Sequence, residues 1–237
     1  MRGFLRGALA ALLASLPSVA GAGQLQAGPT LIEITPAASA TRLLLRNTGS
    51  LPVAAQVRVY AWSQSGGEDQ LVPSAQLVVS PPINELQPGG EQVVRVVRLG
   101  PPASGADQTY RVIVDELPRP GRASGRTVNV RLRYVLPVFV RAADAPPPSL
   151  ACRLDRERSE LTCENSGGRA AQFGATRLVN ASGLTQTLSD GLFGYVLPTS
   201  RRVWVLSDSG RALGGSALRL ETRVNGELAT LHVQRRP

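Results

Sequence analysis

Cys152 and Cys163 are the two cysteines of the chain, and they are the residues whose type and spacing point most directly to chemistry. The segment between them is polar, and pairing the cysteines also pairs Leu154 with Leu161 across a short turn. In an oxidising compartment such a pair forms a disulfide, whereas a redox-active CxxC motif has a much shorter spacing. The sequence therefore predicts a structural disulfide between neighbouring strands.

Other chemistry-bearing residues do not form a catalytic set. His232 is the single histidine, and no second histidine or spare cysteine offers a metal site. The chain has no lysine, which removes Walker-type phosphate loops and lysine-based covalent catalysis. Asp115 and Glu116 are adjacent in an expected strand, so their side chains face opposite sides and cannot act as a carboxylate pair. The sequence favours binding over catalysis, without a cofactor or metal.

The first 22 residues have the pattern of a secretory signal. Arg2 and Arg6 precede the apolar stretch 8–16, which is too short to span a bilayer, and residues 20–22 match an A-x-A cleavage site. We expect an exported chain that begins at Gly23 and is not stably inserted in a membrane.

The charge balance constrains the kind of partner. Without Arg2 and Arg6 the chain keeps 24 basic residues, all arginine, against 17 acidic ones, a net charge of +7. This charge suits an acidic or carboxylate-bearing partner, although compositional bias also explains it. No basic cluster is interleaved with aromatic residues, so nucleic acid is not an expected partner.

The segment Arg126–Arg141 predicts a long half-buried strand, because its residues alternate with a period of two. It would span about 50 Å at roughly 3.3 Å per residue. A strand of this length either joins two domains or offers its apolar row to another chain. That row consists of Val128, Val130, Leu132, Tyr134 and Leu136.

Short strands with turn residues between them occupy both halves of the chain, and no helical periodicity interrupts them. In residues 23–141 they predict an immunoglobulin-like sandwich, with strands at 31–35, 41–47, 53–62, 70–79, 92–99, 109–117 and 126–141. The proline-rich segment 142–149 predicts a semi-rigid linker. Residues 150–237 predict a second β-sandwich, with strands at 150–155, 160–164, 169–179, 201–206, 217–224 and 228–234. The predicted fold class is all-β, with two domains.

Several segments, in this order, resemble the periplasmic chaperones of the chaperone–usher pilus pathway. They are Ser80-Pro81-Pro82-Ile83, Leu86-Gln87-Pro88-Gly89, Val94-Arg95-Val96, the run from Tyr110 to Pro118, Leu136-Pro137-Val138-Phe139-Val140-Arg141, Gly194-Tyr195-Val196-Leu197-Pro198 and Arg201-Arg202-Val203-Trp204. Two of them, Leu136–Arg141 and Gly194–Pro198, look most like the archaic, spore-coat-type branch of the family. The resemblance covers most of the chain that follows the signal.

This resemblance implies a boomerang of two immunoglobulin-like domains in the periplasm that binds pilin subunits by donor-strand complementation. The long strand would fill the groove of a subunit until an outer-membrane usher receives it. Val128, Val130, Leu132, Tyr134 and Leu136 would be the donor residues. An exported adhesion or interaction module of the same fold is the alternative function. Self-association of the free chain through the exposed strand stays open.

The resemblance also assigns charged residues. P-pilus-type chaperones hold the subunit's C-terminal carboxylate with an arginine and a lysine, but Leu31 and Pro137 occupy those two positions here. This departure agrees with the archaic branch and leaves Arg111, Arg131 and Arg133 as candidate anchors, unless they are simply solvated.

Two further features follow from the resemblance alone. Glu116 and Arg141 match an interdomain salt bridge, although the third member of the family's network has no clear match near Val224-Asn225-Gly226. Ser80–Pro81 matches a segment that contains a cis-proline in some relatives.

Overall fold

The computed structural model describes residues 24–118, 130–206 and 217–235. The predicted signal segment, residues 1–22, lies outside these ranges, as does Val128 of the predicted donor row. The described residues form strands and connecting loops, with no helix among them. No helix that could cross a membrane is found in the described part of the chain.

The first half of the chain folds into a sandwich of two sheets. One sheet has the order β1-β3-β8-β6, and the other has the order β2-β10-β9-β4-β5 with β7 added to β4. The strands are β1 (Leu25–Gly28), β2 (Ile32–Ile34), β3 (Ala40–Asn47), β4 (Val53–Ser65), β5 (Glu68–Pro73), β6 (Leu77–Ser80), β7 (Ile83–Leu86), β8 (Glu91–Arg98), β9 (Gln108–Glu116) and β10 (Arg133–Val140).

The core of this sandwich follows from alternation along its strands. Every second residue of a strand points to the same face of its sheet, and these residues are apolar and buried. They include Leu43 and Leu45 of β3, Val53, Ala55 and Val57 of β4, Val94 and Val96 of β8, Val112 and Val114 of β9, and Leu136, Val138 and Val140 of β10. The opposite row of β4 and β9, which includes Trp62 and Arg111, therefore lies on the outer face of the β2-β10-β9-β4-β5 sheet.

The second half forms a curled sheet in the order β15-β14-β18-β19-β11-β12-β17, with β13 and β16 paired to each other and β13 also to β18. Its strands are β11 (Leu150–Asp155), β12 (Glu160–Asn165), β13 (Ala171–Phe173), β14 (Thr176–Asn180), β15 (Thr185–Ser189), β16 (Gly194–Val196), β17 (Ser200–Val205), β18 (Leu218–Val224) and β19 (Glu227–Arg235). They enclose a separate core around Phe173, Leu161 and Leu220.

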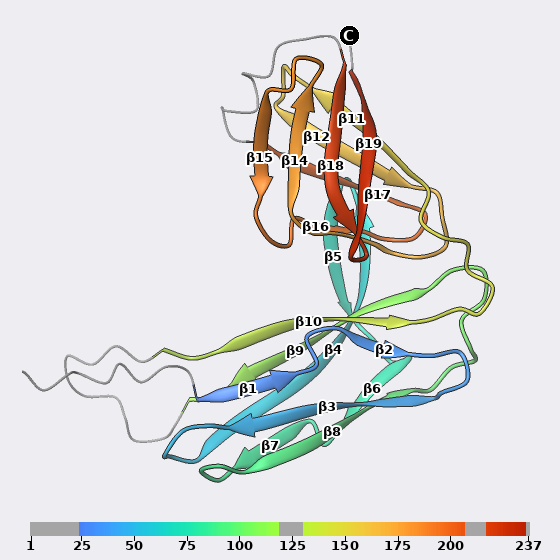
Figure 1. The fold of residues 1–237 in the computed structure, drawn as a ribbon. Coiled ribbons are helices and arrows are strands. Elements are labelled where there is room, and N and C mark those ends of the chain that lie inside the picture. The colour runs from blue at the N-terminus through green and yellow to red at the C-terminus, as the bar shows by residue number, and fades with distance from the viewer. Residues whose placement is uncertain (1–23, 119–129, 207–216, 236–237) are drawn as a thin grey trace, which may run out of the picture.

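Figure 1 shows the two halves set at an angle to each other, with the β4–β5 hairpin reaching from the first toward β16 and β17 of the second. This is the predicted arrangement of two immunoglobulin-like sandwiches in a boomerang. The predicted disulfide is also confirmed: Cys152 of β11 and Cys163 of β12 lie directly opposite each other and are bonded. The Ser80–Pro81 peptide bond is cis.

Several strands differ from the prediction. The expected strand 70–79 is divided into β5 and β6, and the expected strand 169–179 is divided into β13 and β14. Short strands such as β1, β7 and β16 were not predicted. Each has only three or four residues, and a period of two cannot be recognised over so short a length.

Candidate functional site

The candidate binding site lies along β10, the part of the long predicted strand that the structure shows, because one edge of β10 is only partly paired. β10 pairs with β9 along its whole length, but β2 pairs with it only at Val138–Val140. Between Arg133 and Pro137 the other edge has no neighbouring strand within the described residues. An unpaired edge exposes backbone donors and acceptors that can pair with a strand of another chain.

The predicted strand Arg126–Arg141 is longer than the one observed. β10 begins at Arg133, residues 130–132 have no strand assignment, and residues 126–129 lie outside the described part of the chain. One backbone hydrogen bond, from the amide of Glu116 to the carbonyl of Leu132 at 2.9 Å, continues the pairing with β9 by one residue. The strand shortens because β9 ends at Glu116, so no strand of the described residues continues opposite residues 130–131.

The predicted donor row is divided by burial. Val130 is 67% exposed, Leu132 and Tyr134 are partly buried against the core, and Leu136 is only 5% exposed within it. The hydroxyl of Tyr134 donates a hydrogen bond to the carbonyl of Leu25 at 2.6 Å. The prediction of Leu136 as a donor residue was therefore wrong, because its side chain packs in the core of its own domain. Val130 and Leu132 are the described residues of the row that another chain could reach.

The three candidate anchors lie in different surroundings. Arg133 forms an ion pair with Asp115, which also pairs with Arg58 at 2.5 Å. Arg131 is exposed and lines a surface hollow beside Arg133. Arg111 lies farther along β9, next to Tyr195 of the second domain, and its guanidinium forms no ion pair or hydrogen bond with any described residue. The structure does not gather the three into one site.

Arg111 is held by aromatic rings instead of carboxylates. Its guanidinium carbon lies 3.5 Å from the centre of the Trp62 ring and 5.3 Å from the centre of the Tyr195 ring. Burial lowers the pKa of Arg111, and the charge of Asp69 and the nearby Tyr195 oppose that change. A guanidinium stays protonated in proteins, so this is a positive charge with unused hydrogen-bond donors at the contact between the two domains.

The predicted interdomain salt bridge between Glu116 and Arg141 was wrong. Arg141 pairs instead with Glu33 of β2 and with Asp107, whose carboxylate lies 2.6 Å from the guanidinium. Burial lowers the pKa of Arg141, but hydrogen bonds to Asp107 and Glu33 outweigh it and raise that pKa. Because β9 and β10 are antiparallel and Val140 lies opposite Gln108, the residue near Arg141 is the one that precedes β9, whereas Glu116 ends that strand.

The junction between the domains is built around the β4–β5 hairpin. The side-chain amide of Gln64 donates to the carbonyl of Tyr195 at 2.8 Å and accepts from the amide of Leu197 at 3.0 Å. The amide of Val203 donates to the carbonyl of Gly67 at 2.9 Å. Gly67 has a positive φ of 90°, and a Cβ there would collide with the side chain of Val203. These contacts fix Tyr195 next to the first domain.

The junction residues Trp62, Gln64 and Tyr195 were not predicted as part of a site. Trp62 is the last residue of the predicted strand 53–62, and Tyr195 lies in the Gly194–Pro198 segment that carries the family resemblance. Those two signals were present in the sequence, but nothing in it indicated that the residues meet. Asp107 was missed because only the register of β9 and β10 places it beside Arg141.

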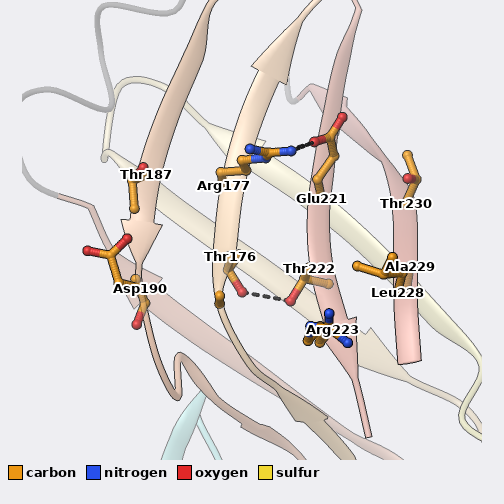
Figure 2. A pocket seen from close by; sticks show the side chains of 12 residues that line it. Thr176, Arg177, Thr187, Asp190, Glu221, Thr222, Arg223, Leu228, Ala229 and Thr230 are labelled. Atoms are coloured by element: carbon orange, nitrogen blue, oxygen red, sulfur yellow. Dashed lines mark hydrogen bonds and ion pairs between the residues drawn. The ribbon is translucent and has the colours of Figure 1, made fainter. Parts of the chain in front are cut away.

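A hollow of about 470 Å³ lies on the sheet of the second half and is the clearest competing site (Figure 2). Its lining is polar: Arg177 is paired with Glu221 at 2.8 Å, and the hydroxyls of Thr176 and Thr222 lie 2.7 Å apart. These side chains satisfy one another, and the hollow contains no histidine or cysteine. No group of histidine, cysteine and acidic residues that could hold a metal occurs in the described part of the chain.

Comparison with solved structures gives the same architecture. The CsuC–CsuE chaperone–tip adhesion subunit pre-assembly complex from archaic Csu pili of Acinetobacter baumannii matches with a TM-score of 0.70 and 23% identity, over 90% of this chain and 99% of that one. The Escherichia coli chaperone DraB matches with a TM-score of 0.61 and 19% identity, over 90% and 96% of the two chains. The Salmonella enterica SafA pilin–SafB chaperone complex matches with a TM-score of 0.63 and 15% identity, over 89% and 96%. These likenesses show a shared fold.

Sequence comparison identifies the family. The curated protein sequences give no significant match. The family model of the pili and flagellar-assembly chaperones, PapD N-terminal domain, matches residues 24–145, which is 122 of the 237 residues. The matched region includes β10, its unpaired edge and Arg111. The chain belongs to the family of pili and flagellar-assembly chaperones.

Proposed function

We propose that this chaperone binds pilin subunits in the periplasm by donor-strand complementation and delivers them to an outer-membrane usher. In this proposal the unpaired edge of β10 pairs with a strand of the subunit, and Val128, Val130 and Leu132 enter the subunit's apolar groove. Arg111 binds the C-terminal carboxylate of the subunit. The signal-like segment 1–22 is consistent with export to that compartment.

The observation that supports the proposal most strongly is the exposed end of the row beside an unpaired strand edge. Val130 is exposed, whereas the later residues of the row pack in or against the core of their own domain. A contact with a partner therefore explains an apolar residue at position 130 better than a contact within the domain. Burying each such side chain contributes roughly 1.5–3 kcal/mol, or about 5–9 kcal/mol gross for three of them. The loss of translational and rotational freedom offsets part of this gain.

Two further observations support the details. The Acinetobacter complex joins a chaperone to a tip adhesion subunit, and the Salmonella complex joins a chaperone to a pilin, so subunits of these kinds are the expected partners. Leu31 and Pro137 cannot donate hydrogen bonds from their side chains at the anchor positions of P-pilus-type chaperones. Arg111 has the free donors that they lack, which agrees with the archaic branch.

Periplasmic co-expression with candidate pilin subunits, followed by pull-down, tests the donor row. Val130→Asp should reduce captured subunit by at least about a hundredfold, because it removes apolar burial and places a charge in the groove. Val205→Asp is the matched control, since Val205 is also a highly exposed valine, at 79%, and lies on β17 of the second domain. The thermal unfolding of both variants should match that of the unmodified protein.

The same valine-to-aspartate substitution should strongly reduce subunit capture at position 130 and leave it unchanged at position 205. Equal capture by Val130→Asp and by the unmodified chaperone would overturn the proposed role of the row. Equal loss in Val130→Asp and Val205→Asp would also count against it, because a general effect of added charge would then explain the result.

A further inference from the structure

The aromatic residues around Arg111 come from both domains. Trp62 lies in the outer row of β4, Phe139 belongs to β10, and Tyr195 belongs to β16 of the second domain. Together with Ala170 and Leu197 they form an apolar cluster that is separate from the two domain cores. The rings of Trp62 and Tyr195 meet edge to face at 81°, with their centres 5.3 Å apart.

The aromatic cluster orients the guanidinium of Arg111 but supplies no carboxylate to neutralise its charge. Its distance of 3.5 Å from the Trp62 ring centre is that of a guanidinium stacked on an aromatic face. Stacking occupies the face of the guanidinium and leaves the N–H groups in its plane free for a planar acceptor. Asp69 is close enough to influence the charge, yet its carboxylate accepts a hydrogen bond from Gln64 at 2.9 Å and lies 3.8 Å from Arg202.

Tyr195 contributes a second unused donor. The residue is 6% exposed, and its hydroxyl forms no hydrogen bond with any described residue. The hydroxyl oxygen itself is not fully buried, so a ligand can reach it. Burial raises the pKa of Tyr195 and Arg111 lowers it less, so the phenol keeps its proton at neutral pH. Gln64 bonds to the carbonyl of Tyr195 and to the amide of Leu197, and so holds the backbone that directly follows the ring. The hydroxyl is therefore an unpaired donor on a ring that lies beside the guanidinium.

We propose that Tyr195 is a second hydrogen-bond donor to the carboxylate that Arg111 binds, and that Trp62 is the positioning residue for Arg111. This inference rests on the proposed function, because the ligand is the free C-terminal carboxylate of a subunit. It makes the anchor a site shared by the two domains. Neither domain alone supplies both donors, so the carboxylate is recognised only across a formed junction.

The test uses the complete mature chain and two synthetic peptides of alternating valine and threonine. Each peptide has about nine residues, enough to follow β10 at roughly 3.3 Å per residue. One ends in a free carboxylate and the other in an amide, and titration calorimetry gives the ratio of their two dissociation constants. A hydrogen-bonded carboxylate on a charged donor predicts a ratio of about 10 to 100 for the unmodified protein.

Four substitutions separate a carboxylate contact from a structural role. Arg111→Ala should bring the ratio close to one, and Tyr195→Phe should reduce it by about 3- to 10-fold, the loss expected for one hydrogen bond. Trp62→Leu keeps an apolar side chain but removes the stacking surface, and it should also reduce the ratio. Tyr110→Phe is the matched control, because Tyr110 adjoins Arg111 in β9 but faces the core.

The ratio distinguishes the possible failures. If Tyr195→Phe weakens the acid and the amide peptide equally, its hydroxyl does not contact the carboxylate and the inference is overturned. If Tyr195→Phe and Trp62→Leu leave the ratio unchanged while Arg111→Ala abolishes it, the proposed anchor stands and the shared site fails. If the unmodified protein binds both peptides equally well, the anchor at Arg111 is wrong, and with it this inference.

Discussion

From Val138 to Val140, β10 lies between β2 and β9 and its side chains are buried, whereas from Arg133 to Val135 β9 is its only neighbour among the described strands. The inner part, Leu136–Val140, completes the core of the first sandwich. The outer part, Arg133–Val135, continues to Leu132, which is partly buried, and to Val130, which is 67% exposed. One strand therefore belongs to its own domain at one end and is available to another chain at the other.

This difference shows that alternation with a period of two identifies an apolar row but not which of its residues pack in their own domain and which stay exposed. Val130 and Leu136 belong to the same row and differ in exposure by more than tenfold, 67% against 5%. Neighbouring strands make the difference, because β2 and the core of the sandwich cover only the inner part. Substitutions at the two ends should therefore separate stability from binding.

Leu136 gives the largest expected effect on stability. Leu136→Ala leaves a cavity in the core, and the free energy of unfolding should fall by about 2–5 kcal/mol. Val130→Ala should change it by less than about 0.5 kcal/mol, because the side chain is exposed. Urea denaturation in a Trp204→Phe background measures both, since Trp62 is then the single tryptophan and reports on the first domain. Equal effects of the two substitutions would contradict the division of the strand.

The sequence predicted the parts of this strand that depend on residue type. The alternation identified the row, and the cysteine spacing identified a cross-strand disulfide that the structure confirms. It could not show where the strand stops being paired, because that depends on the length of β9 and on the position of β2. For the same reason Leu136 was grouped with the exposed donor residues.

The charged residues at the two ends of β10 give the next largest contrast. Arg141 is 25% exposed and pairs with Asp107, whose side chain is fully buried, whereas Arg133 is 64% exposed and pairs with Asp115. Arg141→Ala leaves a buried carboxylate without its partner, and we expect a loss of about 3 kcal/mol. Arg133→Ala breaks a surface pair and should cost at most about 1 kcal/mol. The same denaturation assay compares them, and a larger loss for Arg133→Ala would contradict this ranking.

Glu116 shows why the site was harder to predict than the fold. The family resemblance assigned Arg141 to an interdomain salt bridge with Glu116, but Arg141 pairs with Glu33 and Asp107, which both belong to the first half of the chain. The error arose because adjacency in three dimensions follows from strand register, which the sequence did not fix. The contact of Trp62, Arg111 and Tyr195 could not be predicted for a similar reason. It forms because the β4–β5 hairpin extends from the first domain to the second, and no local sequence pattern indicates that contact.

The pH dependence of Asp115 is the smallest of these effects and tests the outer part of the strand. Burial raises the pKa of Asp115, but hydrogen bonds from Arg58 and Arg133 outweigh it, so the pKa in the folded protein lies below the usual value of about 3.9. A carboxylate with a lowered pKa stabilises the fold at pH values above about 3.9, and this contribution disappears as the pH falls through the lower folded pKa.

Because both arginines are well exposed, the contribution of Asp115 should be only about 0.2–1 kcal/mol for each pair. Asp115→Asn should therefore unfold at lower urea concentration than the unmodified protein near neutral pH, and the two should converge as the pH falls through the lowered folded pKa of Asp115. Asp190→Asn is the control, since Asp190 is exposed and has no ion pair within the described residues. A difference that stays constant from neutral to acidic pH would mean that Asp115 acts through packing, and that the outer part of β10 is held to β9 by backbone pairing without help from its charges.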